Sequence, residues 1–151
     1  MRRRKILYVV CAVILLIFSA PLWAVSQSAF FDMCMEGNTD GVIKALRSGA
    51  NVNARDNDGM TALMQAAGTN AESVKILLKA KADPNAKDDE GATALIWSAR
   101  EGYPETVIAL LNAGADVKAR DKNGKRAVDY AREIKDFKGS KALRQLESLS
   151  K

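Results

Sequence analysis

The acidic run Asp88-Asp89-Glu90 is the densest cluster of side chains in this 151-residue chain that could take part in chemistry. Carboxylates bind calcium, but a dedicated calcium loop spaces its oxygen ligands along the chain, and this run does not. The chain contains no histidine, the commonest general base and a frequent ligand of transition metals. An enzyme built on this sequence would have to use carboxylates and lysines alone. We therefore expect the run to lie in a solvated loop, and we expect no catalytic residue and no metal site.

The cysteines and glycines do not add a cofactor site. Cys11 lies in an apolar N-terminal stretch, which leaves Cys34 as the one thiol of the remaining chain, too few for a disulfide or a zinc site. Because Cys34 stands between two methionines, we expect a buried thiol rather than a reactive one. Gly102 and Gly124 are isolated and form no phosphate-binding loop. The sequence therefore predicts no cofactor.

The basic charge of the chain is concentrated at its start. The formal net charge is +5, from 23 basic and 18 acidic residues, but four of the basic residues lie in the segment from Arg2 to Lys5. The first acidic residue is Asp32, and the chain after the basic start is nearly neutral with mixed signs. A nucleic-acid-binding surface needs a stripe of positive charge, so we expect no nucleic-acid partner.

Residues 6–25 carry no charge and follow the basic start directly. A basic start, an apolar run and small residues at Ala24 and Ser26 predict a signal peptide of residues 1–26, cleaved before Gln27. About 20 apolar residues could also span a bilayer as an uncleaved anchor, although Pro21 weakens that helix. A buried core helix is disfavoured by the flanking charges. The positive-inside rule places the rest of the chain outside the cytoplasm in both cases.

The remaining sequence repeats itself with a period of 32 to 33 residues. The phrase from Asp56 to Leu63 recurs from Asp88 to Leu95, and a weaker copy opens at Asp121. An alanine-rich stretch and then a run of Val, Ile and Leu follow each phrase, and a further short element follows each run. The three copies of that element begin at Gly49, Lys81 and Gly114. A regular period of this length predicts a solenoid of stacked units.

Single residues indicate where the helices of each unit begin and end. Thr61 and Thr93 stand where a side-chain oxygen can cap the first helix. Gly49 and Gly114 suit a left-handed cap after the second helix, and Lys81 occupies the same position at a cost of about 1 kcal/mol. We expect the second unit, which is also one residue short, to be the least regular. Small residues let first helices approach closely; they are Ala66, Ala67, Ser98 and Ala99.

These registered phrases resemble the ankyrin-repeat family, whose unit is a β-turn followed by two short helices. The resemblance covers about residues 28–137 and implies an all-α solenoid of about four helix-turn-helix units joined by β-turn loops. The expected repeat domain, residues 27–151, contains these units: about 28–55, 56–87, 88–120 and 121–137, then a closing helix at about 140–149. The histidine of the family's Thr-Pro-Leu-His phrase is missing, so its hydrogen bonds between loops must be absent or replaced.

The resemblance also implies a function: a monomeric, non-catalytic module that binds a partner protein through a concave surface of loop tips and first helices. Trp97 and Arg100 are favoured because these types are common interface hot spots, although Trp97 could instead pack between repeats. The expected partner-binding residues are Asn57, Asp58, Met60, Asp89, Glu90, Ala92, Trp97, Arg100, Glu101, Lys122, Asn123 and Lys125. The loop tips change from acidic to basic along the stack.

The leader sets the expected compartment. An exported chain without disulfides or N-glycosylation sequons resembles the periplasmic ankyrin-repeat proteins of bacteria. We expect a periplasmic protein. The alternative is a structural or assembly factor that residues 6–25 anchor in the inner membrane, with its repeats facing the periplasm. The sequence names no partner protein.

Overall fold

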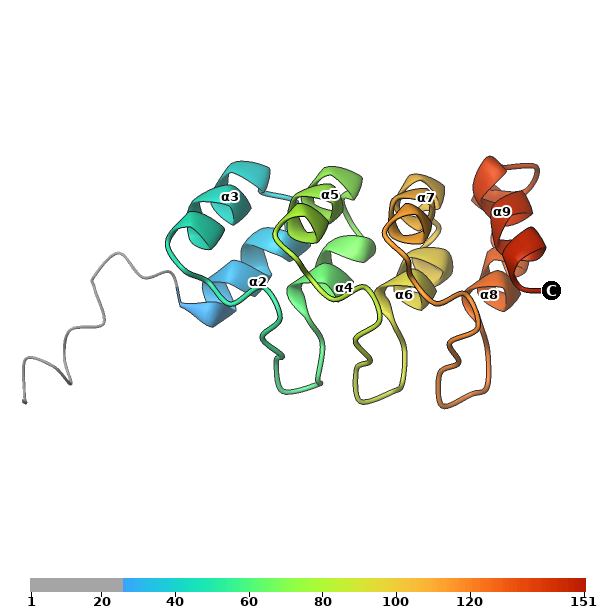
Figure 1. Cartoon of the computed structure of the whole chain (residues 1–151), viewed down its shortest axis with the longest axis horizontal. Helices are drawn as coiled ribbons and strands as arrows, with labels where there is room; N and C mark the ends of the chain where they lie inside the picture. The colour runs from blue at the N-terminus through green and yellow to red at the C-terminus, as the bar shows by residue number, and fades with distance from the viewer. Residues whose placement is uncertain (1–25) are drawn as a thin grey trace, which may run out of the picture.

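The computed structural model describes residues 26–151, which form four helix pairs standing in a row (Figure 1). Eight α-helices in this part of the chain make up the pairs: α2 (Gln27–Met35) with α3 (Thr39–Arg47), α4 (Ala62–Ala67) with α5 (Ala71–Lys79), α6 (Ala94–Glu101) with α7 (Pro104–Asn112), and α8 (Ala127–Glu133) with α9 (Lys141–Leu149). A short 3-10 helix, η1 (Lys135–Phe137), lies between α8 and α9. The predicted all-α solenoid of about four units is confirmed.

The expected signal or anchor helix falls on residues 1–25 and so lies outside the described residues. Among residues 26–151, none of the helices combines the length and the apolar character that a membrane span requires. The first described residue, Ser26, is the N-cap of α2, and its hydroxyl accepts a hydrogen bond from the backbone N–H of Ala29 at 3.2 Å.

The threonines predicted as caps occupy that position. The Thr61 hydroxyl accepts from the backbone N–H of Met64, and the Thr93 hydroxyl from that of Ile96, each at 3.4 Å. Each satisfies one of the amide groups that the first turn of a helix leaves unpaired. These caps fix where α4 and α6 begin, directly after a hairpin loop.

First helices stack on first helices and second helices on second helices, so each unit packs mainly on its neighbours. The small residues predicted at the helix contacts are fully buried, as are Leu77 and Leu110. At the two ends of the stack the largest buried side chains are Phe30 and Phe137. The core is therefore a continuous layer between the two rows of helices, without a central cluster.

The closing helix α9 packs on α7 and α8 as α7 packs on α5 and α6. It is the second helix of the fourth unit. Among the leucines of this helix, Leu146 is fully buried and Leu143 is half-buried, whereas Leu149 is 48% exposed. Leu149 is the last residue of α9.

The second unit departs from the regular pattern at both of the expected places. Its first helix, α4, has six residues where α6 has eight. Lys81 has a φ of 69° and is the one non-glycine residue with positive φ among residues 26–151, whereas Gly49 and Gly114 adopt 90° and 84° at the same position. The left-handed cap is therefore retained, with a side chain that disfavours it.

Replacing Lys81 with glycine is expected to raise the free energy of unfolding by up to about 1 kcal/mol, because glycine has no Cβ to clash in the left-handed region. Urea denaturation would measure this as a higher midpoint with an unchanged slope. Lys79→Gly is the matched control: Lys79 lies in the last turn of α5, where glycine should cost about 1 kcal/mol. A lower midpoint for Lys81→Gly would contradict the assignment of strain.

Two buried hydroxyls occupy the same position in the second helices. Ser73 Oγ on α5 and Thr106 Oγ1 on α7 are fully buried, and neither has a hydrogen-bond partner in the described part of the chain. A buried hydroxyl without a partner loses its hydrogen bonds to water on folding and gains none in return.

Thr106→Val replaces this hydroxyl with a methyl group of similar size, and it is expected to stabilise the fold by about 1 kcal/mol. Thermal unfolding followed by circular dichroism would record a rise in Tm. Thr69→Val is the comparison, because the Thr69 hydroxyl donates to the backbone oxygen of Cys34 at 3.3 Å and its loss should lower the Tm. A fall in Tm for Thr106→Val would mean that the hydroxyl has a partner such as a bound water.

Candidate functional site

Three hairpin loops project from the same side of the stack (Figure 1). Each begins with an aspartate whose backbone N–H donates to a carbonyl four residues later: Asp56 to Met60 at 2.9 Å, Asp88 to Ala92 at 3.0 Å, and Asp121 to Lys125 at 3.1 Å. In all three, one carboxylate oxygen accepts from the backbone N–H groups two and four residues further on, at 2.8 to 3.0 Å. The aspartate thus organises the whole turn.

Backbone hydrogen bonds tie the hairpins to one another. The N–H of Asp89 donates to the carbonyl of Asp58 at 3.1 Å, and the N–H of Lys122 donates to that of Glu90 at 2.8 Å. Nearer the helices, the side-chain oxygen of Asn53 accepts from the N–H of Asp83 at 2.9 Å. These bonds hold neighbouring hairpins in register, and they need no particular side chain at the tips.

The second carboxylate oxygen of each aspartate accepts from a side chain nine residues later, on the first helix of the unit. Gln65 donates to Asp56 at 3.1 Å, Trp97 Nε1 to Asp88 at 2.7 Å, and Tyr130 Oη to Asp121 at 2.5 Å. The pairs join each hairpin to its helix from inside the unit. This chain lacks the histidine of the family's Thr-Pro-Leu-His phrase, and these three pairs hold its hairpins to the first helices.

The two aromatic members of these pairs also contact cations. The Arg100 guanidinium carbon lies 3.7 Å from the Trp97 ring centroid, and Lys125 Nζ lies 4.9 Å from that of Tyr130. Burial raises the pKa of Asp121, but hydrogen bonds from Tyr130 and from the backbone N–H groups of Lys125 and Asn123 outweigh it and hold that pKa below its ordinary value. The same bond to Asp121, helped by burial, raises the pKa of Tyr130.

A family model described as ankyrin repeats, in three copies, matches residues 30–132. The chain belongs to the ankyrin-repeat family. Ankyrin repeats are protein-interaction modules and are typically non-catalytic. No curated protein matches the sequence.

Most of the residues that the sequence predicted to bind a partner protein are accessible to solvent. The exposed ones are Asn57, Asp58, Asp89, Glu90, Glu101, Lys122 and Asn123, and the half-buried ones are Met60, Trp97, Arg100 and Lys125. Ala92 was wrongly placed among them: it is 2% exposed, because its carbonyl and N–H close the second hairpin on Asp88 and its methyl group points into the core. Trp97 packs against the core and also lines a hollow beside the hairpins, so packing and accessibility do not exclude each other for this residue.

Gln65 and Tyr130 also belong to this surface, and sequence reasoning missed them. Both lie at the position of Trp97 in the neighbouring units, nine residues after the first aspartate of a hairpin. The nine-residue spacing is visible in the sequence. Gln, Trp and Tyr have no evident property in common, however, apart from the hydrogen bond that each donates to the first aspartate of its hairpin.

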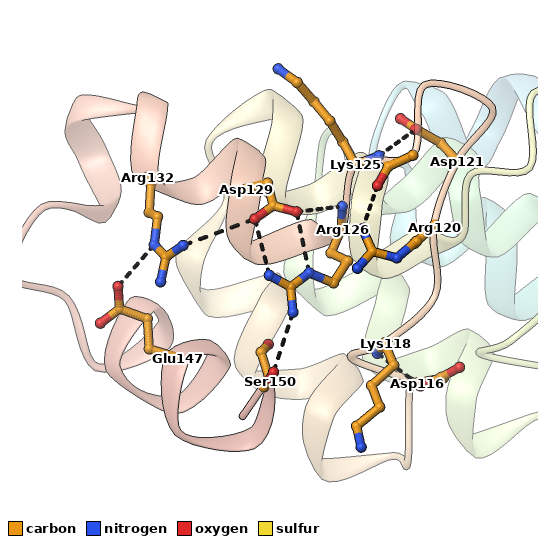
Figure 2. A network of polar contacts seen from close by, with 11 residues as sticks. Asp116, Lys118, Arg120, Asp121, Lys125, Arg126, Asp129, Arg132, Glu147 and Ser150 are labelled. Atoms are coloured by element: carbon orange, nitrogen blue, oxygen red, sulfur yellow. Dashed lines mark hydrogen bonds and ion pairs between the residues drawn. The ribbon is translucent and has the colours of Figure 1, made fainter.

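The fourth unit closes with a polar network in place of the threonine cap of the second and third units (Figure 2). Arg126 stands at the N-cap of α8, and Asp129 accepts from its backbone N–H at 2.9 Å and from its Nε at 3.2 Å. Arg126 also donates to the carbonyl of Ser150 at 3.2 Å, while Arg132 pairs with Glu147 at 3.1 Å. The hydrogen bonds from Arg126 are the main cause of the lowered pKa of Asp129. The network fastens α9 onto α8.

The remaining side chains with reactive potential are the Cys34 thiol and the carboxylates. Cys34 is fully buried, as predicted, and burial raises the pKa of its thiol to about 12. Among residues 26–151, no three His, Cys, Asp or Glu side chains are grouped so that they could hold a metal ion.

Proposed function

We propose that this chain is a monomeric, non-catalytic protein-binding module that contacts its partner through the hairpin tips and the adjoining faces of α4, α6 and α8. One observation carries the proposal. The hairpins are held in register by hydrogen bonds that involve backbone groups, so the register does not depend on the side chains at the tips. A surface ordered before binding loses little conformational entropy when the partner arrives. The tips are acidic in the second hairpin and basic in the third.

Photo-crosslinking tests this surface. Benzoylphenylalanine in place of Asn57 or Asn123, both exposed hairpin residues, is expected to capture one partner protein in living cells. The same group in place of Glu72 or Glu105, which are exposed on the second helices, serves as the control and should capture it far less. Equal capture from the hairpins and the second helices would contradict the proposal, as would no capture from the hairpins.

We further propose that the module works in an extracytoplasmic compartment, the periplasm, after export by residues 1–26. The support is the basic start, the uncharged run of residues 6–25 and the small residues before Gln27. The alternative is a membrane-anchored structural or assembly factor, tethered by residues 6–25 in the inner membrane. Both place the repeats outside the cytoplasm.

The mass of the native chain separates cleavage from anchoring. A mature protein beginning at Gln27 in the soluble fraction supports cleavage, and an intact N-terminus in the membrane fraction supports the anchor. A bulky residue at Ala24 is the cleaner test of processing, because Ser26 also caps α2 and its replacement would affect the fold. Protease added to spheroplasts should digest the repeats in both cases, and their protection would overturn the export proposal.

A further inference from the structure

A hollow of about 240 Å³ lies where the first and second hairpins meet α6. It is lined by Asp58, Met60, Asp88, Asp89, Glu90 and Trp97. Sites for small molecules enclose about 300 to 1,000 Å³, so this space is better matched to a single long side chain. The hollow lies on the surface that we propose to bind a partner.

The walls of the hollow are of two kinds. Met60 and Trp97 are apolar and suit a hydrocarbon stem or a flat cation, whereas the remaining lining residues are carboxylates. Among residues 26–151 these carboxylates are not grouped so that they could hold a metal ion. This combination is what an organic cation with an apolar stem requires.

The negative charge around the hollow is only partly neutralised within residues 26–151. Asp89 pairs with Arg55 at 3.9 Å and Glu90 with Lys122 at 3.3 Å, and all four of these side chains are about half exposed or more. Exposed ion pairs are weak, so a cation from a partner can replace Arg55 or Lys122. Asp58 makes no ion pair with any residue of this part of the chain. The four carboxylates that line the hollow thus outnumber the three nearby cations, which are Arg55, Lys122 and Arg100.

The chain itself places cations on aromatic rings at this position of the repeat. In the fourth unit Lys125, from the hairpin, lies over Tyr130 and is held there by Glu133 at 3.0 Å. The equivalent hairpin residue in the third unit is Ala92, which is too short to reach Trp97. Arg100, from the helix, is the one described residue whose cation lies on the Trp97 ring. The hairpin side of the third unit therefore has the acceptor carboxylates without a lysine of its own.

We propose that the hollow receives an arginine side chain from an exposed segment of the partner protein. The guanidinium stacks near the Trp97 indole, and its N–H groups donate to Asp58 and Glu90. Arginine fits better than lysine because its planar group both stacks on an aromatic ring and forms paired hydrogen bonds with carboxylates. This inference rests on the proposed function and adds the chemistry of the partner.

A probe titration tests the inference on the full-length, ¹⁵N-labelled chain in detergent micelles. The probe is Nα-acetyl-arginine methylamide, and the readout is the indole N–H signal of Trp97, distinguished from that of Trp23 by Trp97→Phe. We expect a saturable shift with the arginine probe. The citrulline analogue, which has the same shape without the charge, should bind about tenfold more weakly. The lysine analogue should fall between them.

Two double variants with the same change in charge locate the site. Asp58→Asn with Glu90→Gln should weaken the arginine probe about tenfold, since both carboxylates line the hollow. Asp40→Asn with Glu72→Gln, on α3 and α5 away from the hollow, should leave the affinity unchanged. Equal binding of arginine and citrulline, the same loss in both double variants, or no saturable shift would each overturn the inference.

The outcome is distinguishable from that of the crosslinking experiment. Capture of a partner at Asn57 or Asn123 without arginine binding would leave the proposed function standing and reject the cationic contact. Arginine binding at Trp97 without capture at the hairpins would retain the hollow as a cation site and reject the hairpins as the protein-binding surface.

Discussion

Replacing Leu95 with alanine is expected to lower the free energy of unfolding by about 3 to 4 kcal/mol. Leu95 is 1% exposed on α6, the helix that packs on α4, α7 and α8. The substitution removes buried methyl groups and leaves a cavity that neighbouring helices on several sides keep from collapsing. Denaturation by guanidinium, followed by circular dichroism at two protein concentrations, would measure the loss.

Leu149→Ala provides the matched control for Leu95. It makes the same chemical change at a position that is 48% exposed, and it should cost less than about 1 kcal/mol. If the two variants lost the same stability, the interior of α6 would not be close-packed, and the assignment of the stack's core would be wrong.

Removing the Asp88 carboxylate is expected to have the second largest effect, a loss of about 2 to 3 kcal/mol for Asp88→Ala. Asp88 is 7% exposed, and its carboxylate accepts from the backbone N–H groups of Glu90 and Ala92 and from Trp97 Nε1, so alanine leaves three donors without their partner. The second hairpin should loosen with it. Chemical denaturation measures the stability, and the indole N–H signal of Trp97 reports the lost bond.

Two further variants separate the parts of this effect. Asp88→Asn keeps one oxygen for the hairpin amides but turns a donor toward Trp97 Nε1, so it should cost less than alanine and still shift the indole signal. Asp89→Ala removes the neighbouring exposed carboxylate, which contributes little beyond a weak pair with Arg55. An equal loss in Asp88→Ala and Asp89→Ala would show that the aspartate does not organise the loop.

The repeat architecture was predictable because residues close together in the sequence determine the turn, the cap and the two apolar faces of each unit. Thr61 and Thr93 were located as caps since capping depends on residues only three positions apart. Lys81 was identified by register alone, because its position equals that of two glycines.

The details of the surface were less predictable, since they depend on contacts between helix and hairpin. Ala92 falls at a loop position that is half-buried in the neighbouring hairpins, and only the packing of the third unit shows that it is covered. The partners of Asp56 and Asp121 required the three-dimensional pairing of a loop with the helix that follows. Arg126 stands where the second and third units have a threonine cap, and its backbone N–H donates to Asp129, a contact that the sequence alone did not indicate.

Because each unit packs mainly on its neighbours, the units need not all unfold together. The units at either end can open while the middle stays folded, so amide exchange should be fastest in α2, α3, α8 and α9 and slowest in α4 to α7. A partner that binds the second and third hairpins can do so only when the third and fourth units are both closed. Its binding should therefore slow amide exchange in α9, a helix of the fourth unit that it does not touch.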